Sequence, residues 1–166
     1  PRQLNVKDVL KAFIDFREEV ITRRTTHDLV RARERAHTLV GLAIAVANLD
    51  PIIKLIREAP DAATARAELV AMPWPANDTA PLIALIDEPD RSVDEAGNYN
   101  RSDAQARAIL ELRLHRLTGL ERDKIADDLT EIVDRIREFL EILQSRARLF
   151  EILRAELLAV REAFAN

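Results

Sequence analysis

The chain has 166 residues, of which 48% are hydrophobic, 33% are charged and 4% are aromatic, with only 3 glycines. This composition favours helices over sheets, in one domain with a real core or in an extended helical element that carries a small lobe. The 25 basic and 29 acidic residues give a net charge of -4, which argues against a domain whose main task is gripping phosphate backbones.

There is no cysteine, so disulfides, thiol catalysis and zinc–thiolate sites are excluded, and a reducing cytoplasm is compatible with the composition. No uninterrupted apolar run is long enough to span a bilayer, and the first five residues carry no signal-peptide pattern. We therefore expect no membrane partner. Because the chain does not begin with methionine, we expect it to be a piece of something longer.

A long helix is predicted from Val6 to about Leu49, because Asn5 is a good N-cap and the stretch contains no proline. Its first part has apolar residues at alternating steps of three and four, which is typical of a coiled-coil seam. These residues are Val6, Val9, Phe13, Phe16 and Val20. The next seam positions are Arg23 and His27, and beyond them the helix becomes richly apolar, as if entering a core.

Several short helices follow. Asp50-Pro51 ends the long helix and begins another, since proline at a first helical position loses no hydrogen bond. Further short helices are predicted from Asp61 and from Thr79, and Trp74, between two prolines, is expected to fill the interior of a lobe. Residues 87–101 are acidic and contain Pro89 and Gly97, which predicts a flexible, exposed loop.

Ser102 and Gln105 have the spacing of a capping box, which predicts a helix N-terminus. We expect Gly119 to end this helix, and Thr118 with Glu121 to form a second capping box. Apolar residues lie on nearly every side of the helix, namely Ile109, Leu110, Leu112, Leu114 and Leu117. Such a helix must bury more than one face, which predicts that a compact lobe, or a partner subunit, packs around it.

A second long helix is predicted after Gly119, with two apolar seams in a heptad repeat. One seam consists of Leu129, Ile136, Leu143, Phe150, Leu157 and Phe164. The other consists of Ile125, Ile132, Phe139, Leu153 and Val160, with Arg146 as the only interruption. In an antiparallel pair, Arg146 would lie near Arg23 and His27, so these three residues are candidates for a joint. A polar layer that only sets the register of the two helices is the alternative.

The predicted fold is all-α: a long antiparallel two-helix coiled coil capped by a small globular helical tip. We assign residues 1–38 to the ascending helix, 39–121 to the tip with its loop at 87–101, and 122–166 to the descending helix.

Catalytic and metal sites are not expected in this chain. Glu34 and His37 have a spacing used in di-metal bundles, but no second such motif occurs, so a metal-dependent helical enzyme rests on these two residues alone. The three histidines fall on different segments, and no serine or cysteine partner is suggested by their spacing. Tyr99 has no basic cluster beside it, and packing against the lobe is its better interpretation. The basic residues at 23–24 and 31–35 are better explained as a solvated helix face than as a DNA contact.

Four stretches resemble the A subunit of DNA gyrase, namely residues 17–25, 31–37, 47–53 and 108–121. The last of them reads Ala-Ile-Leu-Glu-Leu-Arg-Leu-His-Arg-Leu-Thr-Gly-Leu-Glu. The resemblance covers essentially the whole chain and corresponds to the coiled-coil arm and tip of the exit gate, or C-gate. The Leu-Thr-Gly-Leu-Glu run and the insert before Tyr99 look more like gyrase than like topoisomerase IV.

The resemblance implies a cytoplasmic type IIA DNA topoisomerase that works with the B subunit of gyrase in ATP-dependent negative supercoiling. ATP and magnesium would act through other domains, so no cofactor is expected in this chain. A DNA duplex would leave between the two copies when the tips separate. The family's catalytic tyrosine lies upstream, and Tyr99 matches a structural tyrosine instead. This chain alone should therefore not cleave DNA.

The resemblance also implies a homodimer contact at the tip, for which the candidates are Ile109, Leu110, Arg113, Leu114 and Leu117. Arg113 is in addition the candidate contact for a gate-targeting toxin. Two alternatives remain: a non-catalytic coiled-coil module for dimerisation or for holding other proteins, and the equivalent part of topoisomerase IV.

Overall fold

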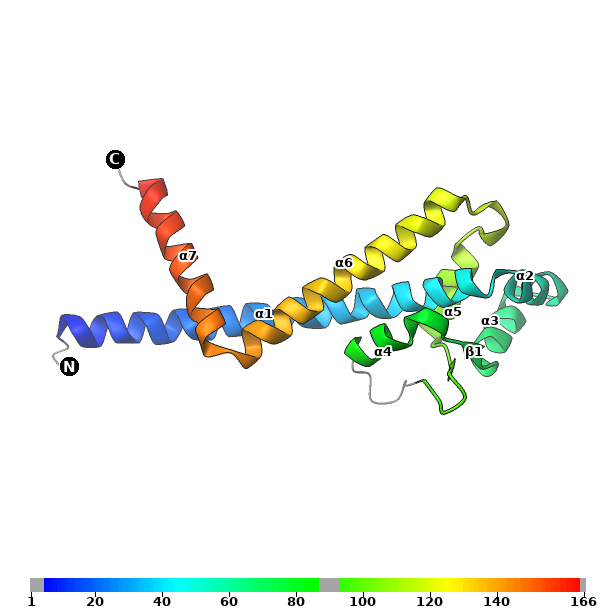
Figure 1. Cartoon of the computed structure of the whole chain (residues 1–166), viewed down its shortest axis with the longest axis horizontal. Coiled ribbons are helices and arrows are strands. Elements are labelled where there is room, and N and C mark those ends of the chain that lie inside the picture. The colour runs from blue at the N-terminus through cyan, green and yellow to red at the C-terminus, as the bar shows by residue number, and fades with distance from the viewer. Residues whose placement is uncertain (1–4, 87–92, 165–166) are drawn as a thin grey trace. The chain divides into compact units, whose positions relative to one another are not determined.

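The computed structural model describes residues 5–86 and 93–164, and the predicted all-α class is confirmed (Figure 1). The helices are α1 (Val6–Ala47), α2 (Leu49–Glu58), α3 (Ala62–Ala71), α4 (Ala80–Ile86), α5 (Asp103–Glu111), α6 (Gly119–Gln144) and α7 (Arg146–Phe164), with short 3-10 turns η1 (Asn77–Thr79) and η2 (Leu114–Arg116). Two short strands, β1 (Trp74–Pro75) and β2 (Asn98–Tyr99), pair antiparallel with Trp74 opposite Tyr99.

The chain divides into two compact units. The arm unit consists of residues 1–31 and 137–166, and the lobe consists of residues 32–136. Helices α1 and α6 therefore contribute to both units. The lobe includes parts of both long helices that the sequence assigned to the ascending and descending arms.

The arm unit is held by a small apolar core between α1 and α7 and the end of α6. Ile21, Ile142, Leu149 and Leu153 are buried in this core. At its edge, Arg17 and Arg24 of α1 both pair with Glu156 of α7. The hydrogen bond from Arg24, together with the charges of both arginines, holds the pKa of Glu156 below its ordinary value. Arg146, near the start of α7, also pairs with Glu18, so α7 contacts α1 over residues 17–24.

The second long helix is not continuous, and this part of the sequence prediction is wrong. Helix α6 ends at Gln144 and α7 begins at Arg146, so Ser145 interrupts the helix. The Ser145 hydroxyl accepts a hydrogen bond from the Arg148 N–H at 3.3 Å, which is how serine caps a new helix. Heptad periodicity alone does not reveal such a competing local hydrogen bond.

The predicted seam residues are not buried in the first part of α1 or in the last part of α7. Val6, Val9, Phe13 and Phe16 are exposed, as are Leu157, Val160 and Phe164. Around the break, Ile142 and Leu149 are buried, whereas the predicted seam residues Leu143 and Phe150 are only half-buried. On both sides of Ser145 the buried residue therefore lies one position before the predicted seam residue, whereas the seam residue Leu153 is buried as predicted.

In the lobe, α2, α3 and α5 gather beside the C-terminal end of α1 (Figure 1). Their interior residues include Val40 and Ile44 of α1, Ile52 of α2, Leu69 of α3 and Ile109 of α5. Asp61 caps α3 by accepting the Thr64 N–H at 2.7 Å, and this hydrogen bond lowers the pKa of Asp61. Among the described helices, none alone is long and apolar enough to cross a membrane. Only α1 and α2 together pass that test, and they are bent by 93°.

The stretch expected to be an exposed loop, 87–101, is partly different. Residues 87–92 lie outside the described residues, but the following residues form a turn and then β2, so that Tyr99 and Arg101 are buried. Gly97 has a φ of 81°, a left-handed conformation that suits glycine in this turn. Trp74, paired with Tyr99, is 4% exposed and fills the interior of the lobe as predicted.

Candidate functional site

Helix α5 is fixed at its first turn by the predicted capping box, which the structure confirms. The Ser102 hydroxyl accepts the Gln105 N–H at 3.0 Å, and the Gln105 Oε1 accepts the Ser102 N–H at 2.9 Å. Each side chain thereby satisfies a backbone donor that a helix start would leave unpaired. The beginning of α5 is thus held in one conformation.

The same glutamine ties α5 to α1 and to β2. The Gln105 Nε2 donates to the His37 carbonyl at 2.6 Å and to the Tyr99 hydroxyl at 3.0 Å. On the other side, the His37 Nε2 lies 2.7 Å from the Ser102 hydroxyl oxygen. Gln105 is fully buried, so these hydrogen bonds replace the water that it loses. His37 thus serves to hold the lobe together, and no group of three metal-ligating side chains occurs among the described residues.

Helices α1 and α5 approach closely where Gly41 faces Gln105. A Cβ atom at Gly41 would lie 2.7 Å from the Gln105 Cγ, which is closer than real Cβ contacts. Since the Gln105 side chain is held by hydrogen bonds at both ends of its amide, it cannot easily move aside. The glycine therefore permits the approach that brings Gln105 to the His37 carbonyl.

Arg101 is a buried cation that the sequence patterns did not predict, because it lies in the stretch expected to be an exposed loop. It is 1% exposed, and its guanidinium carbon lies 4.7 Å from the centre of the Trp74 ring. Burial lowers the pKa of Arg101 to about 10, so the group remains protonated at neutral pH. None of its three guanidinium nitrogens has a hydrogen-bond partner among the described residues. Stacking on the indole offsets part of the resulting cost.

Helix α5 ends earlier than the sequence predicts. It stops at Glu111, and the Leu114 N–H then donates to the Leu112 carbonyl at 2.8 Å around Arg113, which makes a tight three-residue turn. Gly119 does not end a helix, since it is the first residue of α6 and its φ is not positive. The second capping box is confirmed, because Thr118 and Glu121 exchange hydrogen bonds of 2.8 and 3.2 Å. A helix start therefore outweighs the helix-stop signal at Gly119.

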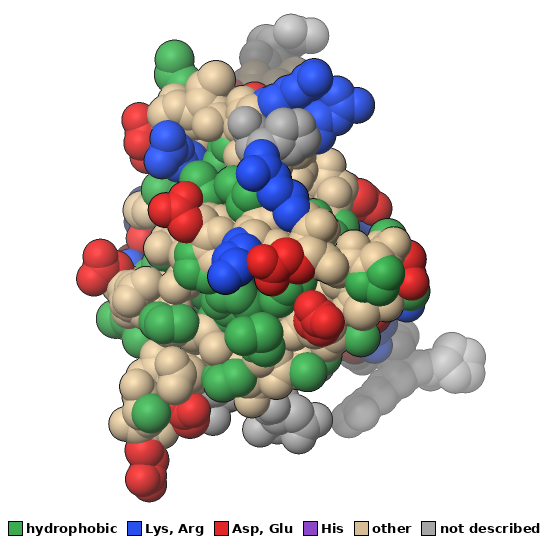
Figure 2. Space-filling view, turned by 90° about the vertical axis from the view of Figure 1, so that its right-hand side faces the viewer, with side chains coloured by type: hydrophobic (Ala, Val, Ile, Leu, Met, Phe, Trp, Pro, Cys, Tyr) green, Lys and Arg blue, Asp and Glu red, His purple; other side chains and the backbone are tan. Residues whose placement is uncertain are grey.

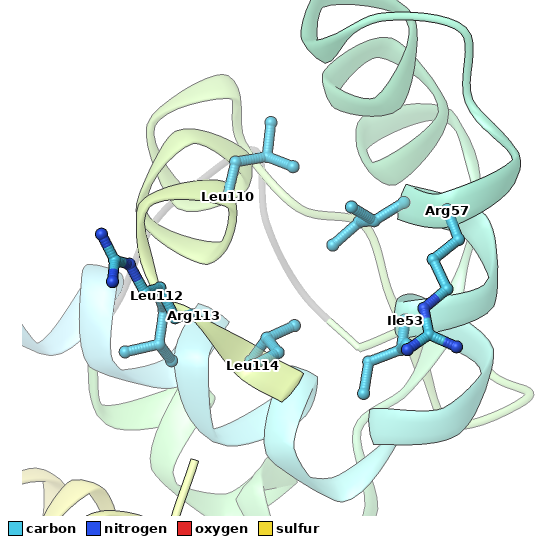
Figure 3. A pocket seen from close by; sticks show the side chains of 7 residues that line it. Ile53, Arg57, Leu110, Leu112, Arg113 and Leu114 are labelled. Carbon is cyan, nitrogen blue, oxygen red and sulfur yellow. The ribbon is translucent and has the colours of Figure 1, made fainter. Parts of the chain in front are cut away.

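The turn after α5 forms one wall of an apolar cleft in the lobe (Figure 3). Helix α2 forms the other wall, and the cavity volume is about 180 Å³. The cleft is lined by Ile53, Ile56, Arg57, Leu110, Leu112, Arg113 and Leu114. In Figure 3, Leu110 and Leu114 on one side face Ile53 and Arg57 on the other. Such a concave apolar surface with basic groups at its edge suits an apolar side chain accompanied by negative charge.

The five residues predicted for the dimer contact differ in how far they are buried in the lobe. Ile109 and Leu114 are buried, Leu110 and Leu117 are half-buried, and Arg113 is exposed. The structure brings Leu110, Arg113 and Leu114 together at the cleft, whereas Leu117 follows η2 and does not line it. The interface itself stays a prediction.

The sequence patterns did not single out the α2 side of the cleft or one exposed leucine. Within α2, Ile52 and Leu55 face the interior, while Ile53 and Ile56 are half-buried and line the cleft. Leu120, the second residue of α6, is 83% exposed. Figure 2 shows hydrophobic side chains gathered in the middle of the face it presents, with charged side chains among them.

The three residues predicted for a joint lie in the arm unit. Arg23 and His27 are exposed within the uninterrupted helix α1, and Arg23 pairs with Glu19. Arg146 directly follows the break at Ser145, where its guanidinium pairs with Glu18 at 3.0 and 3.2 Å. Of these three residues, only Arg146 is therefore adjacent to an observed interruption of a helix.

Comparison with known proteins identifies clear relatives. Residues 1–158 match the family model for the A subunits of DNA gyrase and topoisomerase IV. The chain is 53% identical over 161 residues to the DNA gyrase A subunit of Granulibacter bethesdensis, covering 97% of the chain and 17% of that protein. It is 47% identical over 166 residues to the Rickettsia conorii protein of the same name, covering 100% of the chain and 18% of that protein. It is 46% identical over 175 residues to the DNA gyrase A subunit of Aeromonas salmonicida, covering 100% of the chain and 19% of that protein. The chain thus spans about a fifth of the length of these relatives.

Proposed function

The chain belongs to the family of DNA gyrase and topoisomerase IV A subunits, and we propose that it is the exit-gate segment, or C-gate, of such a subunit. In this proposal the lobe contacts the lobe of a second copy and holds two subunits together. The contact opens to release a transported DNA duplex during ATP-dependent negative supercoiling.

The observation that carries the proposal is the apolar surface around the end of α5. Leu110, Leu112 and Leu117 are only half-buried. Leu110 and Leu112 line the mainly apolar cleft, and Leu117 follows three residues after Leu114, which also lines it. An apolar patch with charged groups at its edge is typical of a protein–protein contact. Arg113, which is exposed beside this cleft, adds a charged group that a partner can recognise.

The composition of the patch suits a contact that must open repeatedly. A permanent interface is large and strongly apolar, whereas one that opens in each cycle should be smaller or more polar. Here two arginines lie among five apolar side chains at the cleft. The net charge of -4 argues against tight binding of a duplex that passes through the gate.

The remaining assignments follow from membership of this family. We propose that the gyrase B subunit supplies the ATPase, that ATP and magnesium act in other domains, and that the complex is cytoplasmic. Arg113 is the proposed contact for a gate-targeting toxin, and the break beside Arg146 is the proposed joint in the arm. The equivalent segment of topoisomerase IV and a non-catalytic dimerisation module are the alternatives.

Replacing Leu117 by aspartate is expected to weaken the dimer. The change places an unpaired charge in the contact surface, where it must lose its water when the two lobes meet. Leu117 is half-buried and outside the main core, so the lobe should stay folded. Sedimentation equilibrium of the 166-residue chain should give a dissociation constant at least roughly ten times higher than that of the original sequence, which corresponds to about 1.4 kcal/mol.

Met72→Asp is the matched control, because Met72 is also a surface apolar residue of the lobe, 48% exposed, and does not line the α5 cleft. This variant should dimerise as the original chain does. An original chain that stays monomeric, or equal weakening by both variants, would contradict the proposed contact.

A further inference from the structure

Helix α5 is anchored at its first turn by three other elements of the lobe. The amide nitrogen of Gln105 donates to the His37 carbonyl of α1 at 2.6 Å and to the Tyr99 hydroxyl of β2 at 3.0 Å. Asp103 pairs with Arg66 of α3 at 3.0 Å. Because Gln105 is fully buried, water does not compete for its hydrogen bonds. The start of α5 is therefore fixed relative to α1, α3 and β2.

The other end of α5 carries part of the proposed contact surface. Leu110 lies in the last turn of the helix, and Leu112 and Arg113 follow directly after it. Helix α5 has 9 residues and is therefore roughly 13 Å long, so a tilt of about 10° at its first turn displaces its far end by about 2 Å. The orientation set at Gln105 thus decides where these contact residues lie.

We propose that Gln105 positions the contact surface relative to α1, so that α5 and residues 37–47 of α1 move as one piece. The inference rests on the proposed dimer contact and names a residue that acts on it from behind. Gln105 is fully buried, so it does not touch a partner itself. Helix α1 continues from the lobe into the arm unit, and the hydrogen bond to the His37 carbonyl therefore links the arm helix to the contact surface.

Gly41 sets how closely α1 and α5 approach at this point. A Cβ atom there would lie 2.7 Å from the Gln105 Cγ, so an alanine must push the first turn of α5 away from α1. A change on α1 should therefore disturb the contact surface in the same way as a change on α5.

Dissociation constants of the dimer test this role. Gln105→Ala and Gly41→Ala are compared with the original chain by sedimentation equilibrium, at a temperature where circular dichroism shows that each variant is folded. We expect both to weaken the dimer, Gln105→Ala at least roughly tenfold, because association must then also order α5.

Ile83→Ala is the matched control for lost stability. Ile83 is buried in α4, which packs against η1, so its truncation should destabilise the lobe as Gln105→Ala does while leaving the anchors of α5 in place. Its dissociation constant should stay within about twofold of the original value.

The outcomes separate this role from the dimer contact itself. If the original chain is a dimer, but the Gln105 and Gly41 variants dimerise equally well or Ile83→Ala weakens the dimer as much as they do, Gln105 only stabilises the lobe. The inference is then wrong while the dimer contact stands. Should Gln105→Ala not fold, Gly41→Ala decides by the same comparison. A monomeric original chain would contradict both the contact and the positioning role.

Discussion

Replacing Gln105 by alanine is expected to lower the free energy of unfolding of the lobe by about 2–4 kcal/mol. The change leaves the Ser102 N–H without its acceptor, and a buried unpaired group costs about 1–3 kcal/mol. In addition, it removes the hydrogen bonds that Gln105 donates to the His37 carbonyl and the Tyr99 hydroxyl. It also leaves a space in the interior, which adds to the loss. Trp74 is the only tryptophan and is buried in the lobe, so its fluorescence during urea unfolding reports this change.

Gln144→Ala is the control for this experiment, since Gln144 is exposed at the end of α6. Its effect should stay within about 0.5 kcal/mol. If Gln105→Ala were no more destabilising than Gln144→Ala, the hydrogen bonds between α5, α1 and β2 would not contribute to the stability of the lobe.

Gly41→Ala is expected to destabilise the lobe by up to about 2 kcal/mol, although alanine favours helices. Helix propensity alone would give a gain of about 1 kcal/mol. The new Cβ would meet the Gln105 Cγ at 2.7 Å, and overpacking in a core costs about 1–3 kcal/mol. Because hydrogen bonds hold the Gln105 side chain, we expect the steric cost to exceed the gain. Urea unfolding followed by Trp74 fluorescence measures the difference.

Gly119→Ala, in α6, measures the gain in helix propensity without the steric cost. A Cβ at Gly119 meets no atom within 4 Å, and its φ is not positive, so the substitution should be neutral or slightly stabilising. If Gly41→Ala were stabilising as well, the close approach of α1 and α5 in the structure would be wrong.

Local signals in the sequence predict helix starts well. Ser102 with Gln105 and Thr118 with Glu121 form the expected capping boxes, because both partners of these hydrogen bonds lie close together in the chain. Asp61 also caps a helix as expected. The boundary expected at Asp50-Pro51 is displaced slightly, since α2 already begins at Leu49.

Signals that compete with one another predict the structure less well. Gly119 can end a helix or lie inside one, and the capping box at Thr118 decides in favour of a helix start. At Ser145 the heptad repeat favours continuation while the hydroxyl favours a new cap. The burial of Arg101 depends on the pairing of β2 with β1. These strands are far apart in the sequence, so no local pattern predicts that they pair.

Only one of the two walls of the cleft can be predicted from the sequence, namely the wall formed by residues 110–114. The apolar character of residues 109–117 is visible in the sequence, so Leu110, Arg113 and Leu114 could be proposed for a contact. Helix α2 supplies the opposite wall through its packing against η2, which depends on tertiary structure. Leu120 could not be singled out, because nothing in the sequence shows that a leucine after a glycine is exposed.

If the lobe is a gate through which DNA leaves, locking two lobes together must stop supercoiling. Leu117→Cys in a complete A subunit that carries this chain, assembled with the B subunit, would be crosslinked between the two copies by a short bismaleimide. We expect supercoiling to fall at least roughly tenfold in the crosslinked fraction, because the transported duplex cannot leave, while enzyme without Leu117→Cys keeps its activity after the same treatment. Undiminished supercoiling by crosslinked enzyme, or failure of the two copies to crosslink at this position, would contradict the gate.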